Sequence, residues 1–238
     1  MADKTEIPKY RHEYKYLCNS VQASVLKTRV GMLMARDSHT GKYGNYRIRS
    51  LYFDDWDDRC YYENESGIGE RAKYRIRIYN GDSKRITLEK KSKSRGMTLK
   101  TMCLIDEQIC RQMMEGRVAV QKNMTVMQKS LIGEMQLKNM RPVVIVEYVR
   151  IPFIEQNGNV RVTFDEAISS SNEIKNFFEK NIAMRPILEA GQSVLEIKWD
   201  EFLPDYIKNH LQLDSLSQTS FSKYYLCRKY NTYGGARV

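Results

Sequence analysis

The sequence has no run of 18 apolar residues, and its polar N-terminus carries no apolar segment of the kind found in secretory signals. Its five cysteines are scattered, odd in number and never spaced as C-x-x-C. This spacing argues against both a disulfide framework and a structural zinc site. We therefore expect no signal peptide, no membrane span and a cytoplasmic location with reduced thiols.

Several common catalytic motifs are also missing. No G-x-x-x-x-G-K-[ST] occurs, which excludes ATP binding through a P-loop, and the three histidines form no H-E-x-x-H. The stretch GIGERA (Gly67–Ala72) matches G-x-G-x-x-A but precedes a strand pattern rather than a helix, so we reject a dinucleotide site. Because no internal repeat or Pro-, Gly- or Ser-rich linker is present, we predict a single domain over residues 1–238.

Positive charge is what the sequence has in excess. Lys and Arg number 39 against 29 Asp and Glu, which gives a formal net charge of +10 in 238 residues. This balance favours an anionic partner, whether nucleic acid, a membrane surface or a phosphate-rich small molecule.

Alternation of apolar and polar residues recurs along the chain and predicts about eight strands. These segments are Arg11–Leu17, Tyr46–Asp54, Ala72–Tyr79, Arg85–Lys93, Thr98–Asp106, Pro142–Phe153, Asn159–Asp165 and Ser193–Trp199. Helical patterns cover Ser20–Ala35 (with Ser20 as a cap), Asp106–Gly116, Met124–Met140, Glu173–Lys180, Asp205–Leu213 and Ser220–Tyr230. Asn80–Gly81 and Asn157–Gly158 are typical of hairpin turns. The predicted fold is α+β, a closed antiparallel β tunnel with helices packed outside.

The strand RAKYRIRIY (Arg71–Tyr79) places Lys73, Arg75 and Arg77 on one face and apolar residues on the other. A solvated face of an antiparallel sheet has the same alternation, so one strand decides nothing. The pattern recurs, however, on five further segments. These carry Arg11, Glu13 and Lys15; Arg47 and Arg49; Glu89, Lys91 and Lys93; Arg161 and Asp165; Glu196 and Lys198.

The charged face and the apolar face of each such strand need different surroundings. Like charges two residues apart on a strand lie roughly 7 Å from one another and repel by about 2 kcal/mol at an effective dielectric of about 20. Turned inward, the charged faces would need a polyanion for neutralisation, while the apolar faces would need helices as cover. An open sheet with helices on its apolar face would satisfy the same pattern.

Six motifs in order along the chain resemble those of a known family. They are R-x-E-x-K-Y (Arg11–Tyr16), YRIRSLYFDD (Tyr46–Asp55), ERAKYRIRIY (Glu70–Tyr79), LEKKSK (Leu88–Lys93), VLEIKW (Val194–Trp199) and SFSKY (Ser220–Tyr224). Together they are similar to the vacuolar transporter chaperone (VTC) type of polyphosphate polymerase domain, a member of the triphosphate tunnel metalloenzymes. The resemblance implies a β tunnel in which the γ-phosphate of ATP is transferred to a growing polyphosphate chain, with Mn²⁺ or Mg²⁺ as cofactor.

The resemblance also implies roles for individual residues. Catalytic contacts fall on Arg75, Arg77, Lys91 and Lys223; substrate-binding contacts fall on Lys15, Lys100, Arg150, Arg161 and Ser222; the metal-binding glutamate is Glu196. Glu13 and Glu89 are either additional metal carboxylates or counter-ions of neighbouring bases. The implied partners are ATP and polyphosphate; no nucleic acid is expected, and the sequence identifies no membrane partner.

The motifs depart from the family pattern at two positions, and these departures bear on which function the chain has. Tunnel phosphohydrolases usually begin E-x-E-x-K, but Arg11 replaces the first glutamate; family polymerases often read K-x-S-K, but Ser220 replaces the first lysine. Two other functions stay open beside the polymerase. One is a tripolyphosphate or nucleoside triphosphate phosphohydrolase, which Arg11 disfavours. The other is a module that binds polyphosphate or RNA without turnover and with a steep salt dependence.

Overall fold

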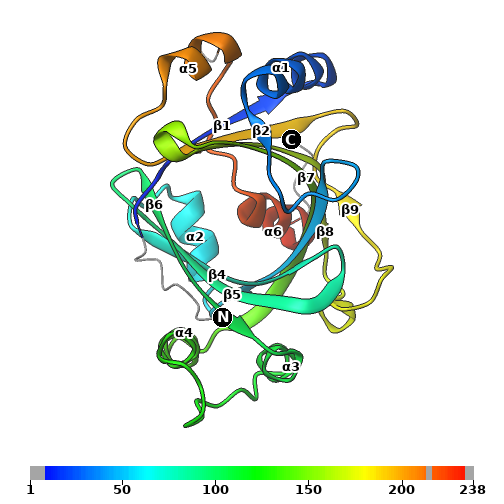
Figure 1. Cartoon of the computed structure of the whole chain (residues 1–238). Coiled ribbons are helices and arrows are strands. Elements are labelled where there is room, and N and C mark those ends of the chain that lie inside the picture. The colour runs from blue at the N-terminus through cyan, green and yellow to red at the C-terminus, as the bar shows by residue number, and fades with distance from the viewer. Residues whose placement is uncertain (1–8, 213–215, 234–238) are drawn as a thin grey trace.

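One antiparallel sheet organises the chain in the computed structural model, which describes residues 9–212 and 216–233 (Figure 1). Its strand order is β1-β10-β8-β7-β3-β4-β5-β6, while β2 pairs with β7 and β9 pairs with β8. The strands are β1 (His12–Cys18), β2 (Ala35–Arg36), β3 (Tyr46–Asp54), β4 (Arg71–Tyr79), β5 (Asp82–Ser94), β6 (Met97–Ile105), β7 (Arg141–Glu155), β8 (Val160–Ser171), β9 (Arg185–Pro186) and β10 (Ser193–Trp199). The α+β class and the eight main strands agree with the sequence prediction.

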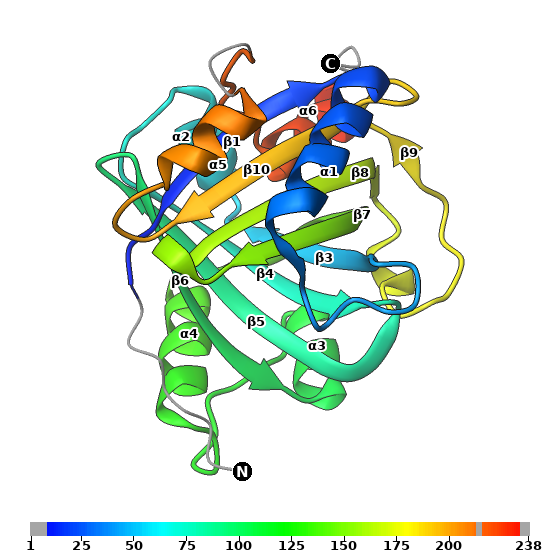
Figure 2. The same cartoon turned by 45° about the horizontal axis from the view of Figure 1, so that its top comes forward.

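The sheet curls until its two edge strands approach one another (Figures 1 and 2). Arg11, next to β1, and Thr98 of β6 exchange two backbone hydrogen bonds of 2.9 and 3.0 Å. Among the described residues this is the only ladder contact between the edges. The sheet is therefore a curled half-barrel whose edges meet at one end.

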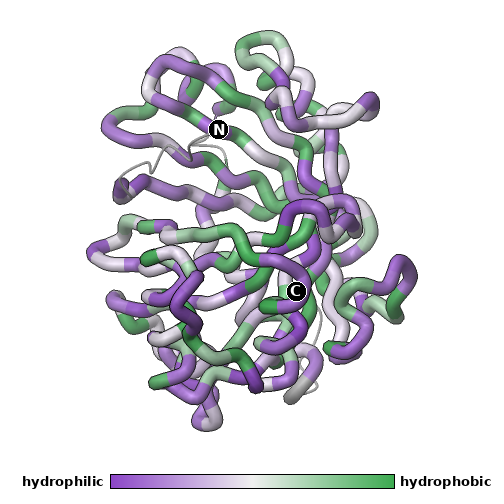
Figure 3. Tube along the Cα trace, turned by 60° about the horizontal axis from the view of Figure 1, so that its bottom comes forward, coloured by the Kyte–Doolittle hydropathy of each residue, from purple (hydrophilic) through white to green (hydrophobic). Residues whose placement is uncertain are grey.

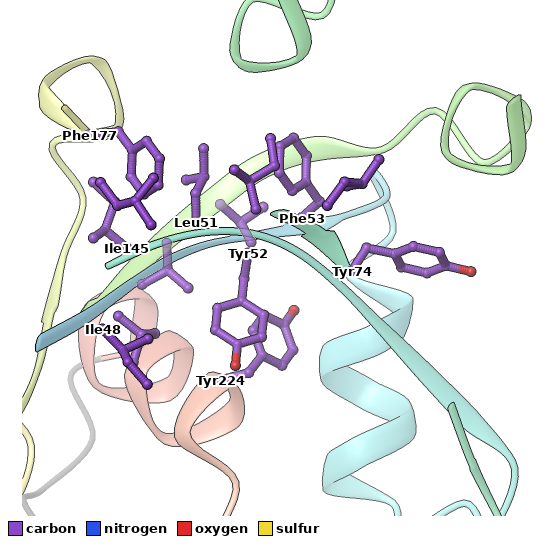
Figure 4. Close-up of a cluster of buried hydrophobic side chains, with 14 of the residues drawn as sticks. Ile48, Leu51, Tyr52, Phe53, Tyr74, Ile145, Phe177 and Tyr224 are labelled. Atoms are coloured by element: carbon purple, nitrogen blue, oxygen red, sulfur yellow. The ribbon is translucent and has the colours of Figure 1, made fainter. Parts of the chain in front are cut away.

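Within the described residues, six α-helices pack on both sides of the curled sheet. They are α1 (Ser20–Leu33), α2 (Arg59–Glu65), α3 (Glu107–Met114), α4 (Val126–Leu137), α5 (Asp205–Leu211) and α6 (Lys223–Tyr233). Helices α1 and α5 cover the outer side near β10, whereas α3 and α4 cover it near β5 and β6 (Figure 1). Helices α2 and α6 instead lie on the concave side (Figure 4). The prediction that all helices pack outside is therefore wrong for these two.

Successive side chains along each strand point to opposite faces of the sheet, so side chains pack on its outer and its concave side (Figure 3). On β3, Leu51 and Phe53 point to the outer face, whereas Ile48 and Tyr52 point to the concave side, where Tyr52 lies against Tyr224 of α6 with ring centroids 5.2 Å apart (Figure 4). All five side chains are at most 5% exposed. Both faces of β3 are thus buried, because α6 fills the concave side at this part of the sheet.

Some predicted elements differ from those observed. The pattern at Glu173–Lys180 gives only the 3₁₀ turn Ile174–Asn176. The physical reason is Arg49, whose guanidinium binds the carbonyl oxygens of Phe177 (2.9 Å) and Glu179 (2.6 Å), oxygens that a continuing helix would use internally.

Helix ends and turns follow local side-chain chemistry. Asn19, not Ser20, caps α1, and its Oδ1 accepts a hydrogen bond from the backbone N–H of Gln22 at 2.9 Å. The Asn80–Gly81 hairpin is as predicted, with positive φ at both residues. Helix α5 ends at Leu211; the remainder of its predicted range, at 213, lies outside the described residues.

The loop containing Asn157–Gly158 spans four residues between the paired Glu155 and Val160, rather than two. Gly158 has φ +74°, and a Cβ there would lie 2.7 Å from the carbonyl oxygen of Phe202. Only glycine fits this close approach without displacing backbone.

One hydrogen-bonded cluster ties α4 to the outer face of the sheet. Glu134 accepts hydrogen bonds from Tyr74 (2.7 Å), Lys90 (2.7 Å) and Lys138 (3.0 Å). Burial raises the pKa of Glu134, but these three donors outweigh it and lower the pKa to about 2.

Glu134→Gln tests this tether through the pH dependence of stability. Because the folded pKa lies below that of the unfolded chain, the carboxylate's contribution is fully present above about pH 4.5 and is lost as pH falls towards 2. We expect the variant to be less stable by about 1–2 kcal/mol near pH 7, after allowance for partial exposure, and the gap to narrow at pH 3. Urea unfolding of wild type and variant at pH 7 and pH 3 measures the difference in their stability. A difference of constant size would contradict the low pKa of Glu134.

Candidate functional site

Charged side chains from seven strands and α6 gather on the concave side of the sheet. The cations are Lys15, Lys73, Arg75, Arg77, Lys91, Lys100, Arg150, Arg161, Lys198 and Lys223. Their carboxylate partners are Glu13, Asp37, Glu89, Asp165 and Glu196. We call this set the concave cluster. Ten basic side chains face five carboxylates, so basic groups outnumber acidic groups by five.

One contact shows that opposite parts of the sheet converge. Lys91 of β5 donates hydrogen bonds of 2.8 and 2.6 Å to the two oxygens of Glu13 on β1. These strands are not neighbours in the sheet, since β1 and β6 form its edges and β5 lies beside β6. The ion pair therefore reaches across the concave side and brings charges from both halves together.

Glu89 is the centre of one group within the concave cluster. Its carboxylate, 1% exposed, receives the guanidinium of Arg75 at 2.7 Å, with Arg77 at 3.7 Å and Lys100 at 3.9 Å. Burial raises the pKa of Glu89, but the charges of Arg77 and Arg75 outweigh it and the pKa falls far below its usual range. Tyr52 adds its hydroxyl oxygen as an acceptor for Arg75 at 2.9 Å.

Asp165 is the centre of a second group. Its two oxygens accept a bidentate pair of hydrogen bonds from Arg150, each 2.7 Å long, and Lys223 approaches to 2.6 Å. Asp165 is fully buried, and although burial raises its pKa, Arg150 and Lys223 lower it below the usual value. Tyr148 lies beneath both cations, with its ring centroid 5.3 and 4.9 Å away.

A third group joins β1 to β10. Lys15 lies 2.8 Å from Glu13 and 3.9 Å from Glu196, which also forms an ion pair with Lys198. Burial raises the pKa of both glutamates, but the surrounding lysines lower each well below its usual range. Burial in turn lowers the pKa of Lys198 to about 8, despite its carboxylate partner.

The structure brings all ten predicted site residues onto the concave side, with Arg161 and Ser222 near its margins. Arg161 binds Asp37 at 2.7 Å and the hydroxyl of Tyr46 at 2.9 Å. Ser222 receives a hydrogen bond of 2.7 Å from Lys73. Ser220, at the position where family polymerases often have lysine, is exposed.

Two residues placed by the sequence on the charged face lie elsewhere. Arg47 and Arg49 point to the outer side, where Arg49 binds Glu147 at 2.7 Å. The concave positions of β3 are instead polar or aromatic, among them Ser50 and Tyr52, which bind Arg77 and Arg75. The interpretation of Arg47 and Arg49 as part of the charged face is therefore wrong.

Sequence reasoning did not assign site roles to Lys73, Asp165, Lys198, Tyr52 and Tyr148. The alternation on their strands was the available signal for the three charged residues, since they share a face with assigned ones. The two tyrosines gave no such signal, because tyrosine suits either face of a strand.

The carboxylates fit a divalent ion only if a substrate supplies further ligands. No group of three or more His, Cys, Asp or Glu side chains suited to a metal ion occurs in the described ranges. Glu13 and Glu196 nevertheless both contact Lys15 and offer hard oxygen donors. Mg²⁺ and Mn²⁺ accept one or two carboxylates when phosphate oxygens complete the shell, so this pair fits such an ion.

Arg11 has no role in this carboxylate pair. It forms an ion pair with Asp200 at 2.6 Å and donates a hydrogen bond to the carbonyl of Asn159 at 2.6 Å. The position that holds the first glutamate in tunnel phosphohydrolases thus carries a cation engaged with the β7–β8 loop and the residue after β10. In the part of the chain that the structure covers, no helix is long and apolar enough to cross a membrane.

Comparison with solved structures identifies the class of fold. An adenylate cyclase candidate from Bacillus halodurans superposes with a TM-score of 0.53 at 16% identity, over 90% of this chain and 95% of that one. An adenylyl cyclase candidate from Hippeastrum, described as having a dominant triphosphatase activity, gives 0.55 at 14% identity, over 94% and 96%. The chain shares its fold with these two proteins.

The family follows from the sequence itself. The VTC domain family matches residues 10–231, almost the whole chain, and the protein belongs to that family. No curated protein matches the chain.

Asp165→Asn tests whether the concave cluster is built for a phosphate chain. Removing the charge leaves Lys223 without its carboxylate and Arg150 with only Glu196, 3.9 Å away, and we expect the melting temperature to fall by roughly 5–10 °C. Tripolyphosphate should stabilise the variant more than the wild type, because its oxygens replace the lost charge.

Glu147→Gln is the matched control, since it breaks an ion pair with the buried Arg49 on the outer side. It should also lower the melting temperature, but without any added response to tripolyphosphate. Equal responses of the two variants in thermal-shift titrations would show that tripolyphosphate does not take the place of the Asp165 carboxylate.

Proposed function

We propose that this chain is a metal-dependent polyphosphate polymerase, which transfers the γ-phosphate of ATP to a growing polyphosphate chain held along the concave cluster. The observation that carries the proposal is the excess of cations there, ten against five carboxylates, in a chain of the VTC domain family. A linear polyanion matches such a surface, because every phosphate unit brings charge to a different pair of strands.

The same proposal extends to the shape of the site. We infer that the half-barrel acts as a closed tunnel formed by one domain over residues 1–238. Two observations support closure: the Arg11–Thr98 bridge between the edge strands and the Lys91–Glu13 ion pair across the concave side.

Positioning and charge neutralisation are the work that phosphoryl transfer demands from a protein. Arg75, Arg77 and Arg150 present planar guanidinium groups that bind phosphate oxygens in pairs, whereas Lys91 and Lys223 add mobile point charges. In the proposed reaction these residues hold the triphosphate and the chain end in line, and they neutralise charge on the transferred group. Lys15, Lys100, Arg161 and Ser222 bind the remainder of the chain.

A divalent ion completes the charge balance of the proposed site. Glu196, with Glu13 beside it, would hold Mn²⁺ or Mg²⁺ together with substrate oxygens. When bound, such an ion supplies Lewis-acid stabilisation of charge on the phosphates.

The chemistry of the cluster favours a phosphate acceptor over water. The carboxylates Glu13, Glu89, Asp165 and Glu196 all have lowered pKa values, because neighbouring cations outweigh the effect of burial. Strongly acidic carboxylates are poor general bases, so none of these four is suited to be the base that activates water. The terminal phosphate of a polymer is already ionised near pH 7 and needs none. Arg11, which stands where tunnel phosphohydrolases usually have a carboxylate, also favours a phosphate acceptor over water.

The polymerase proposal is tested with purified protein, ATP and Mn²⁺, and a gel stained for polyphosphate. We expect long polymer and ADP from the wild type, and loss of both from Glu196→Gln. Free phosphate without polymer would indicate a phosphohydrolase. Neither product, combined with salt-dependent binding of tripolyphosphate, would indicate a binding module.

Adjacent lysines on β5 provide the matched pair of variants. Lys91 lies in the concave cluster, whereas Lys90 binds Glu134 on the outer side. Lys91→Ala should lower turnover by about 100-fold, in line with the loss of one group that stabilises transition-state charge. Lys90→Ala should keep turnover within about threefold of wild type, because it changes net charge equally but away from the site. Equal losses would place the chemistry elsewhere.

A further inference from the structure

Lys73 and Ser222 form a close pair at the margin of the concave cluster. Lys73 Nζ lies 2.7 Å from Ser222 Oγ, and its second polar partner is the side-chain oxygen of Asn64, next to the end of α2. Ser222 directly precedes α6. The pair therefore joins β4 to the start of the C-terminal helix, 149 residues away along the chain.

The hydrogen bonds of Ser222 determine where its proton can go. The hydroxyl oxygen accepts the backbone N–H of Tyr225 at 3.2 Å, and the carbonyl oxygen accepts that of Leu226 at 3.0 Å, so Ser222 caps α6. With one lone pair used by the cap, the hydroxyl hydrogen is free to point to Lys73. A neutral amine at that position accepts this hydrogen, whereas an ammonium cannot.

Lys73 differs from the other cations of the cluster because it has no carboxylate partner in the described part of the chain. The charged groups that face it are cationic: Lys15 from β1, Lys91 from β5 and Arg71 on its own strand. Cys60 from α2 and the ring of Tyr224 from α6, with its centroid 5.7 Å away, complete its surroundings. Burial, and then these cations, hold the pKa of Lys73 well below its usual range.

We propose that Lys73 and Ser222 act as a base and nucleophile pair, and that Ser222 accepts the first γ-phosphoryl group and so becomes the covalent primer of the polyphosphate chain. This inference rests on the proposed function for its phosphoryl donor, ATP. Ser222 Oγ forms a bond to the γ-phosphorus while the bond from that phosphorus to the β–γ bridging oxygen breaks. ADP leaves, and the hydroxyl proton moves to Lys73 Nζ.

The surroundings of Ser222 also suit the product. A phosphoserine at a helix N-terminus interacts favourably with the helix dipole and with the free backbone N–H groups of the first turn. Lys73, protonated in the transfer, becomes a cation beside the new phosphate. Lys15 is also close, since its Nζ donates a hydrogen bond of 2.9 Å to the carbonyl of Phe221. The bound phosphate then presents its own oxygens as the acceptor for the next transfer.

The test is incubation of the full chain with ATP and Mn²⁺, denaturation in acid, and mass spectrometry of the peptide that contains both Ser220 and Ser222. Acid removes phosphate that is bound non-covalently or through lysine nitrogen, whereas a serine ester survives. We expect at least one acid-stable phosphate, a mass increase of about 80 Da, on Ser222. Ser222→Ala should lose this label, Ser222→Thr should retain it in part, and Ser220→Ala, the matched control, should keep it.

Lys73→Arg tests the base, because arginine keeps the positive charge but does not lose its proton. We expect labelling at pH 7.5 to fall by at least 100-fold, in line with the loss of a general base. In the wild type, labelling should accelerate with rising pH, and in the variant it should not. Circular dichroism and thermal melting of each variant establish that it is folded. Labelling of Lys73→Arg at the wild-type rate would overturn the role of Lys73.

The outcomes separate this inference from the polymerase proposal. Polymer made from added tripolyphosphate by an unlabelled chain, or label confined to another residue, overturns the primer role and leaves the polymerase intact. Label on Ser222 without any polymer supports the primer role and contradicts the polymerase.

Discussion

Buried carboxylates hold together a face of this protein that would otherwise repel itself. Glu13, Glu89, Asp165 and Glu196 each connect cations from different elements, and Glu13 connects β1 to β5 across the concave side. Removing one partner from such a buried group leaves an uncompensated charge, which costs several kcal/mol. The curled sheet thus depends on ion pairs on its concave side as well as on apolar contacts.

This arrangement also limits what the site can do. The carboxylates are fewer than the cations, so neutrality requires an added anion. They are held ionised by their partners and therefore serve as counter-ions rather than bases. Lys73 is the exception among the cations, since it has cationic neighbours and hydroxyl and amide partners. On this surface the carboxylates and their partners form structural ion pairs, whereas Lys73 is the group that we propose accepts a proton.

Much of the concave cluster was predictable, because side chains alternate between the two faces of a strand with a period of two residues and this pattern is visible on single strands. Lys73, Arg75 and Arg77 were placed correctly on a common face, as were Glu196 and Lys198. Arg47 and Arg49 have the same spacing but lie outside, since Glu147 and two backbone carbonyls there supply partners. No local pattern specifies such distant partners, and none indicated that α6 would fill the concave side at β3. The hydrogen-bond partners of Lys73 and the ion-pair partners of Asp165 likewise depend on contacts between remote segments.

The pairing of β1 with β10 has a consequence for how the chain reaches its native state. His12 lies opposite Trp199 and Cys18 opposite Ser193, so two strands of the sheet that lie far apart in sequence pair directly. Contacts between residues so far apart in sequence form slowly, because a large loop must close before they contribute stability. On the ribosome, β1 has no partner on this side until β10, which ends at Trp199, has emerged. Its edge is a site for chaperone binding or for wrong pairing during that interval.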